Sequence, residues 1–116
     1  MMSANREIYL RARELLAGHW IQDDLVIEFR GERHFCLLGA IGEAMEGDPT
    51  IFDSSGGLWK ATVLIQVNTA IGITTFTRYE TLRDDVARWN DDRGRTEADV
   101  LALLDRLAGE GEAIRG

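Results

Sequence analysis

The stretch Phe35-Cys36-Leu37-Leu38-Gly39-Ala40-Ile41 decides the fold, and every residue after Cys36 in it is apolar. It predicts a buried helix over about residues 36–45, which Gly47 ends. Gly39 and Gly42 lie inside this helix, although each glycine there costs about 1 kcal/mol relative to alanine. We therefore expect another part of the backbone to pack closely over the small-residue face of the helix.

Helical patterns lie on both sides of this stretch. Apolar residues recur at helical spacing over residues 4–17, over 80–89 and from Thr96 to the glycines near the C-terminus. Thr96 and Asp99 have the spacing of a capping box, which marks the start of the last helix. Residues 58–71 suit either a helix or a strand, and the length of the segment favours a helix. The sequence thus predicts about five helices.

A short β-hairpin is also expected, over about residues 25–35 and across Gly31. Its first arm, Leu25-Val26-Ile27-Glu28-Phe29, is rich in residues that favour strands. No repeat, low-complexity segment or linker divides the chain, and 116 residues is the size of one domain. We predict a single domain, 1–116, of the mainly α class with a short hairpin; the alternative is an α+β fold.

Charge and composition argue against several classes of protein. The chain has 13 Lys and Arg against 20 Asp and Glu, a formal net charge of −7, and Lys60 is its one lysine. This balance argues against a nucleic-acid binder, because such proteins neutralise phosphates with Lys and Arg. No apolar run approaches the roughly 20 residues of a membrane span, and the N-terminus lacks the apolar core of a signal peptide. Because Cys36 is the one cysteine, no disulfide can form within the chain, and we expect a cytoplasmic protein. From the charge and the apolar pattern, we expect it to bind no nucleic acid and no membrane, and no cofactor is predicted.

A second motif, Trp89-Asn90-Asp91-Asp92-Arg93-Gly94-Arg95-Thr96, lies between the last two helical patterns. It predicts a turn in which Asn90 and Asp91 bond the backbone. In a functional interpretation, Trp89 and Arg95 bind a ligand or a partner, together with the neighbouring carboxylates. The structural interpretation is favoured, since nothing in the motif demands a substrate.

The two motifs resemble those of an uncharacterised family of small proteins from actinobacteria and the phages that infect them. Its members carry a Cys-Leu-Leu-Gly-Ala type motif, matched by residues 36–41, and a Trp-Asn-Asp-x-x-Gly-Arg-Thr signature, matched by residues 89–96. A helix that ends near a tryptophan, here residues 15–20, precedes them. The resemblance covers most of the chain outside residues 46–80. It implies a domain of unknown function and supplies no reaction.

Cys36 is the sharpest chemical feature, because a thiol at the start of a helix can ionise more easily and become a nucleophile. His34 or His19 could serve as its base, and Asn90 or Asp91 could orient the imidazole. Against this, the residues that follow are apolar, and free cysteines are usually buried. A core cysteine is therefore favoured. The His34 and Cys36 pair has no second pair to complete a metal site, so no metal is predicted.

We predict a non-enzymatic protein that binds another protein, as an accessory or phage–host interaction domain. The candidate binding residues are Trp59, Tyr79, Trp89, Arg95 and, as a further aromatic, Phe52. Homodimerisation through residues 58–71 is a variant of this hypothesis. The alternatives are a small cysteine-dependent hydrolase or transferase centred on Cys36, and an acidic mimic of nucleic acid that occupies a basic partner. Functional differences are expected in residues 46–80, where the resemblance fades.

Overall fold

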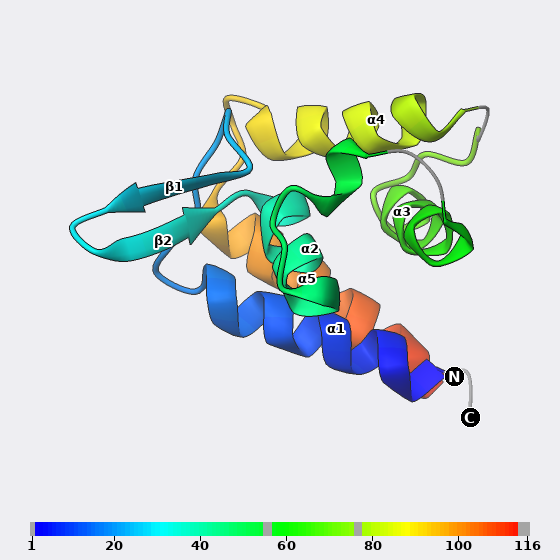
Figure 1. Cartoon of the computed structure of the whole chain (residues 1–116). Helices are drawn as coiled ribbons and strands as arrows, with labels where there is room; N and C mark the ends of the chain where they lie inside the picture. Colours follow the sequence, from blue (N-terminus) through cyan, green and yellow to red (C-terminus); the bar gives the residue numbers. More distant parts are fainter. Residues whose placement is uncertain (1, 55–56, 76–77, 114–116) are drawn as a thin grey trace.

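Within residues 2–54, 57–75 and 78–113, which the computed structural model describes, helices surround one hydrophobic core and a hairpin projects from it (Figure 1). The elements in chain order are α1 (Met2–Leu16), β1 (Val26–Phe29), β2 (Glu32–Phe35), α2 (Leu37–Glu46), the short 3-10 helix η1 (Ile51–Asp53), α3 (Leu58–Ala70), α4 (Tyr79–Asp91) and α5 (Glu97–Ala113). The prediction of a mainly α fold with a short hairpin is confirmed. Among the described residues, no helix combines the length and apolar character needed to cross a membrane.

Helix α2 lies at the centre of the fold, where it contacts both α1 and α4 (Figure 1). Its residues 37–42 are all buried. Gly39 is required by a close approach, because a Cβ there would lie 1.9 Å from the carbonyl oxygen of Leu25. At Gly42, a Cβ would lie 2.7 Å from the carbonyl oxygen of Asp48. The predicted close packing of backbone over this face is confirmed. It comes from the segments just before β1 and just after α2.

Two helix pairs complete the core. Helices α1 and α5 pack side by side, and α3 packs against α4 (Figure 1). The second pair is also joined by the fully buried side chain of Asn68, whose Nδ2 donates to the carbonyl oxygens of Leu64 at 2.8 Å and Leu82 at 3.0 Å. At the surface, Arg13 of α1 and Asp105 of α5 form an ion pair at 2.6 Å. The expected helix over residues 58–71 is therefore a packed helix and not a strand.

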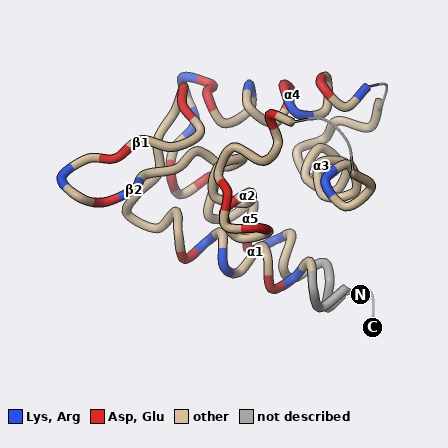
Figure 2. The backbone as a smooth tube through the Cα atoms, viewed as in Figure 1, with Lys and Arg blue, Asp and Glu red and all other residues tan. Residues whose placement is uncertain are grey.

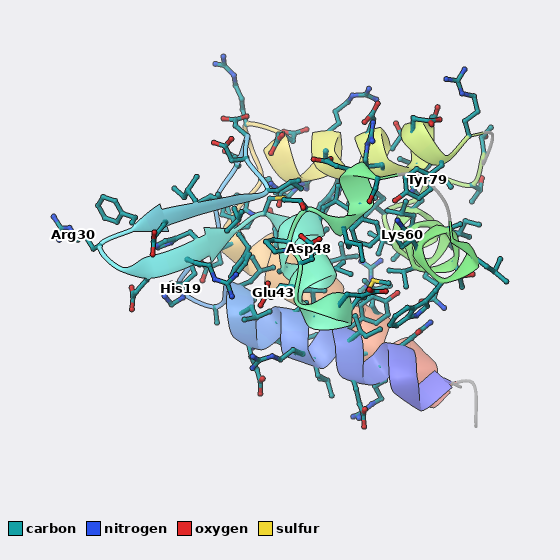
Figure 3. All side chains as sticks on the ribbon, in the orientation of Figure 1. His19, Arg30, Glu43, Asp48, Lys60 and Tyr79 are labelled. Carbon is teal, nitrogen blue, oxygen red and sulfur yellow. The ribbon has the colours of Figure 1, made fainter. Side chains whose placement is uncertain are left out.

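The hairpin is antiparallel, with Val26 opposite Phe35 and Phe29 opposite Glu32. Arg30 and Gly31 form its two-residue turn, with φ values of 55° and 79°. Left-handed φ at both central residues belongs to a type I′ turn, whose twist matches that of paired strands. Figure 3 shows Arg30 at the tip of the hairpin, pointing away from the body of the molecule. The predicted hairpin across Gly31 is confirmed.

Two helices extend further than expected. Helix α4 continues to Asp91, so Asn90 and Asp91 lie in its last turn and not in a connecting turn. Tertiary hydrogen bonds to the Asn90 side chain offset its low helix propensity. Helix α5 continues through Gly109 to Ala113. Leu107 remains buried against the core there, and this packing offsets the cost of a helical glycine.

Candidate functional site

Asn90 joins the two sequence motifs, and it is only 1% exposed. Its Oδ1 accepts hydrogen bonds from the backbone N–H of Leu37 at 3.0 Å and from Nε1 of Trp20 at 2.7 Å. Its Nδ2 donates to the carbonyl oxygen of Ile21 at 3.1 Å. Leu37 is the first residue of α2, so Asn90 satisfies an N–H group that has no partner within that helix. Both polar atoms of the Asn90 amide are occupied by this structural role.

Asp91 holds the segment that precedes β1. Its Oδ1 accepts hydrogen bonds from the backbone N–H of Asp23 and from Nδ2 of Asn90, both at 2.9 Å. Asp23 has a φ of 76°, a left-handed conformation that carries backbone strain for a residue other than glycine. Gln22 adds two bonds, since its Nε2 donates to the carbonyl oxygens of Asn90 at 3.0 Å and Asp92 at 2.8 Å. The end of α4 is thus tied to the chain just before the hairpin.

Cys36 occupies the N-cap position of α2, where its sulfur accepts a hydrogen bond from the N–H of Gly39 at 3.4 Å. The residue is buried in the core, as the sequence favoured. Burial raises the pKa of the Cys36 thiol to about 11, and it outweighs the backbone hydrogen bonds of Gly39 and Leu38, which lower the pKa. A thiol in this environment stays protonated at neutral pH, whereas a nucleophile must be a thiolate.

Neither histidine is positioned as a base for Cys36. The His34 ring packs against the His19 ring, with 4.9 Å between centroids, and edge-on against the Phe29 ring at 6.2 Å. Nε2 of His19 lies 3.4 Å from the carboxylate of Glu32. Among the described residues, no hydrogen bond joins either imidazole to Cys36. In the same part of the chain, no group of three or more His, Cys, Asp or Glu side chains is arranged to hold a metal ion.

Trp89 and Arg95 contact each other. The guanidinium carbon of Arg95 lies 3.8 Å from the centroid of the Trp89 ring, and Nε of Arg95 donates to the Trp89 carbonyl oxygen at 2.8 Å. The predicted capping box follows directly: the Thr96 N–H donates to the Asp99 carboxylate at 3.0 Å, and the Asp99 N–H donates to Oγ1 of Thr96 at 3.1 Å. With Arg106, Trp89 and Arg95 line a hollow of about 410 Å³ beside α5. Their contacts connect α4 to α5.

Trp59, Tyr79 and Phe52 lie in three different environments. Trp59 is 42% exposed on α3, and its Nε1 donates to Oδ1 of Asn5 at 3.4 Å. The hydroxyl of the half-buried Tyr79 donates to the Phe52 carbonyl oxygen at 3.0 Å. Figure 3 shows Tyr79 and Lys60 close together, and Nζ of Lys60 lies 6.0 Å from the Tyr79 ring centroid. Phe52 is fully buried, so this candidate binding residue is instead part of the core.

A cleft of about 560 Å³ lies where the start of β1, α2, η1 and α4 meet. Its apolar lining consists of Leu25, Val26, Cys36, Leu38 and Ala87. Its polar lining consists of Asp23, Asp24, Thr50, Asp53, Arg83, Asp84 and Asp91. Ligand sites commonly have this volume and this mixture of apolar surface with a few polar groups. Cys36 and Asp91, one from each motif, both line the cleft, so the two motifs meet at a concave surface.

The acidic cleft, as we call this site, carries five aspartates and one arginine. Arg83 is already paired with Asp84, with Nε and Oδ1 3.1 Å apart. Over the described ranges, no ion pair neutralises Asp23, Asp24 or Asp53. Figure 2 shows acidic positions from the segment before β1, from η1 and from α4 on the same side of the molecule. The site therefore offers uncompensated negative charge next to apolar surface.

Of the residues that line the acidic cleft, the sequence singled out Cys36 and Asp91 and missed the other four aspartates. The candidate binding residues lie outside the cleft. Trp89 and Arg95 come together as a pair, but Trp59 and Tyr79 do not join them. Asp23, Asp24, Asp53 and Asp84 were visible only as part of the negative net charge. The signal that could have drawn attention to them was the Asp23-Asp24 doublet beside a predicted strand.

The fold and this site define a small, mainly helical domain with an acidic cleft. The chain belongs to the family of unknown function DUF6197, whose model matches residues 2–110. The expectation of an uncharacterised family is thus confirmed, and the matched range contains both motifs. The occurrence of relatives in actinobacteria and their phages stays a prediction. Comparisons with curated proteins and with solved structures gave no match.

Proposed function

We propose that the protein is a non-enzymatic binding module whose acidic cleft takes a basic segment of a protein partner. The observation that carries this proposal is the excess of carboxylates over cations in the cleft, five aspartates against Arg83. A ligand with Lys or Arg side chains would complement that charge, and charge complementarity contributes to both specificity and association rate. Phosphate groups and nucleic acids would be repelled.

The apolar part of the cleft supports the same class of ligand. Two unit charges of opposite sign that lie 4 Å apart attract each other by about 1 kcal/mol in bulk water and by about 4 kcal/mol at an effective dielectric constant of 20. The attraction between a cation and a partly enclosed carboxylate such as Asp91 lies between these two energies. The methylene stems of Lys and Arg pack well on apolar surface, and Leu25, Leu38 and Ala87 provide it. A long basic side chain can therefore use both halves of the lining.

The alternatives have weaker support. A cysteine-dependent hydrolase or transferase needs a thiolate at Cys36, and burial works against that thiolate. A mimic of nucleic acid would use the same carboxylates to occupy a broad basic surface. The concave shape of the acidic cleft favours a narrower ligand, such as one extended segment.

The experiment is a selection of random dodecapeptides on the immobilised full chain, followed by affinity measurement of the enriched peptides. We expect enrichment in Lys and Arg and an affinity that falls as ionic strength rises. The double variant Asp24→Asn/Asp53→Asn should bind these peptides about tenfold more weakly, because each such charge pair contributes roughly 0.5–1 kcal/mol.

The matched control is Glu7→Gln/Glu46→Gln, which makes the same change in net charge at exposed positions outside the cleft. It should bind as the parent does, within about twofold if long-range screening is effective. Selected peptides without an excess of basic residues would contradict the proposal. An equal loss of affinity in both double variants would also contradict it, since the cleft would then be irrelevant.

Homodimerisation through α3 is a separate proposal with its own support. The helix exposes Leu58 at 84%, Trp59 at 42% and Ile65 at 37%. Leu58 and Ile65 are seven positions apart, which puts them on one face of the helix. Exposed apolar side chains that gather on one face are typical of contact surfaces between proteins.

A further inference from the structure

One edge of the hairpin is covered and the other is open. Phe35 in β2 donates its N–H to the His19 carbonyl oxygen at 2.9 Å, and its own carbonyl accepts from the N–H of Ile21 at 3.0 Å. The chain before the hairpin thus lies along β2 as a short extra strand, with Trp20 paired to Phe35. In Figure 1, β1 is the outer strand, on the side of the hairpin away from α1.

The backbone of β1 directs polar groups outward at alternate residues. The Leu25 carbonyl oxygen accepts from the Cys36 N–H at 3.2 Å, on the β2 side, so the Val26 N–H across the same trans peptide points the opposite way. Val26 is also opposite Phe35, whose polar groups point away from β1. By alternation, Glu28 directs its N–H and carbonyl outward as well. Over the described residues, neither N–H donates to a segment outside the hairpin.

This open edge runs directly into the acidic cleft. Val26 and Leu25 line the cleft, and Asp23 and Asp24 immediately precede them. A strand laid along β1 would therefore continue past Val26 into the region where the uncompensated carboxylates lie. Exposed strand edges are known templates for the addition of a strand from another chain.

The charge around the edge decides which strand fits. A second copy of the chain could pair antiparallel through β1, but each copy has a formal net charge of −7 and would bring its own acidic cleft to the interface. Like charges placed together oppose such an association. A basic segment meets the opposite condition, because its cations would face the carboxylates of the cleft.

We propose that the basic segment binds as an added antiparallel strand on β1, an inference that rests on the proposed function. In that register, its residues opposite Val26 and Glu28 exchange backbone hydrogen bonds with them. The side chains of those residues lie on the cleft-lining face of the hairpin and are basic. The intervening side chains lie on the other face, against Ile27 and Phe29, which are 39% and 54% exposed, and are apolar. The recognised pattern is an alternation of basic and apolar residues.

The test uses an acetylated and amidated octapeptide in which lysine and valine alternate, and two N-methylated derivatives of it that are isomers of each other. One isomer is methylated on the backbone nitrogen of each lysine, and the other on that of each valine. The two have the same charge, the same number of methyl groups and the same side chains. Methylation removes N–H donors from only one edge of the added strand. The full-length chain and its Asp24→Asn/Asp53→Asn variant are titrated with each labelled peptide by fluorescence anisotropy at low ionic strength.

The lysine-methylated isomer should bind at least about tenfold more weakly than the parent peptide, because its lost donors are those that face β1. The valine-methylated isomer should bind within about twofold of the parent. Equal affinities of the two isomers, with binding still weakened by the double variant, would overturn strand addition and leave the acidic cleft as a binding site. A selective loss for the valine-methylated isomer would overturn the antiparallel register. If the parent peptide does not bind, or if it binds the double variant with the same affinity as the full-length chain, the proposed function and this inference are both overturned.

Discussion

Replacing Asn90 with alanine removes one amide that bonds three groups in two other segments of the chain. In the structure, the Asn90 amide bonds the Leu37 N–H at 3.0 Å, the Trp20 indole N–H at 2.7 Å and the Ile21 carbonyl at 3.1 Å. The substitution removes the hydrogen-bond partner of all three groups. A buried polar group left without a partner costs about 1–3 kcal/mol. Leu37 is fully buried, whereas Trp20 and Ile21 are half-buried and can reach some water. We therefore expect the free energy of unfolding to fall by about 3–5 kcal/mol.

This loss is a large part of the roughly 5–15 kcal/mol that stabilises a typical domain. Urea unfolding followed by far-UV circular dichroism should show the midpoint of Asn90→Ala lowered by roughly 2 M, given typical slopes. The matched control is Asn5→Ala, which removes an amide that bonds Gln66 at 3.2 Å and Trp59 at 3.4 Å from a half-buried position. It should cost less than about 1 kcal/mol. Equal midpoints for the two variants would refute the view that Asn90 holds the motifs together.

Gly39→Ala should lower the free energy of unfolding by roughly 2–4 kcal/mol, because its Cβ would clash with the Leu25 carbonyl. Gly109→Ala places its Cβ in open space and should be neutral or stabilising. Comparable melting temperatures of the two variants would contradict this prediction. Native Cys36 should react with iodoacetamide at pH 7 at least about a hundredfold more slowly than in the urea-unfolded chain, since its pKa is raised from 9.0 to about 11; equal alkylation rates by mass spectrometry would rule out the burial argument. Because folding raises this pKa, the stabilisation it gives is present below about pH 9 and is lost as the pH rises toward 11, by about 2–3 kcal/mol in total. Cys36→Ser should therefore make stability fall less steeply with pH in this range. If the chain dimerises through α3, Ile65→Lys should shift sedimentation toward the monomer, and an unchanged dimer would place the interface elsewhere.

Local signals in the sequence predicted several elements correctly. The turn at Gly31 follows from its neighbours, because a two-residue hairpin turn needs left-handed φ values that glycine adopts without strain. The capping box of Thr96 and Asp99 depends on bonds between residues three positions apart. The end of α4 was predicted wrongly for the opposite reason. The Asn90 bonds that extend that helix come from Trp20, Ile21 and Leu37, which no local pattern connects to it.

The position of the candidate site depended on tertiary structure in the same way. The sequence singled out the motifs of Cys36 and Asp91, and the structure places both residues in the lining of one cleft. It did not reveal the acidic cleft itself, because Asp24, Asp53 and Asp84 are ordinary surface charges until three separate segments converge. By itself, the sequence determined the helices, the hairpin, the negative charge and the family, since these depend on composition and on neighbours along the chain. Only the packing of α2 against α4 and of η1 beside them decided which carboxylates face one another, because that convergence depends on contacts between residues far apart in the chain.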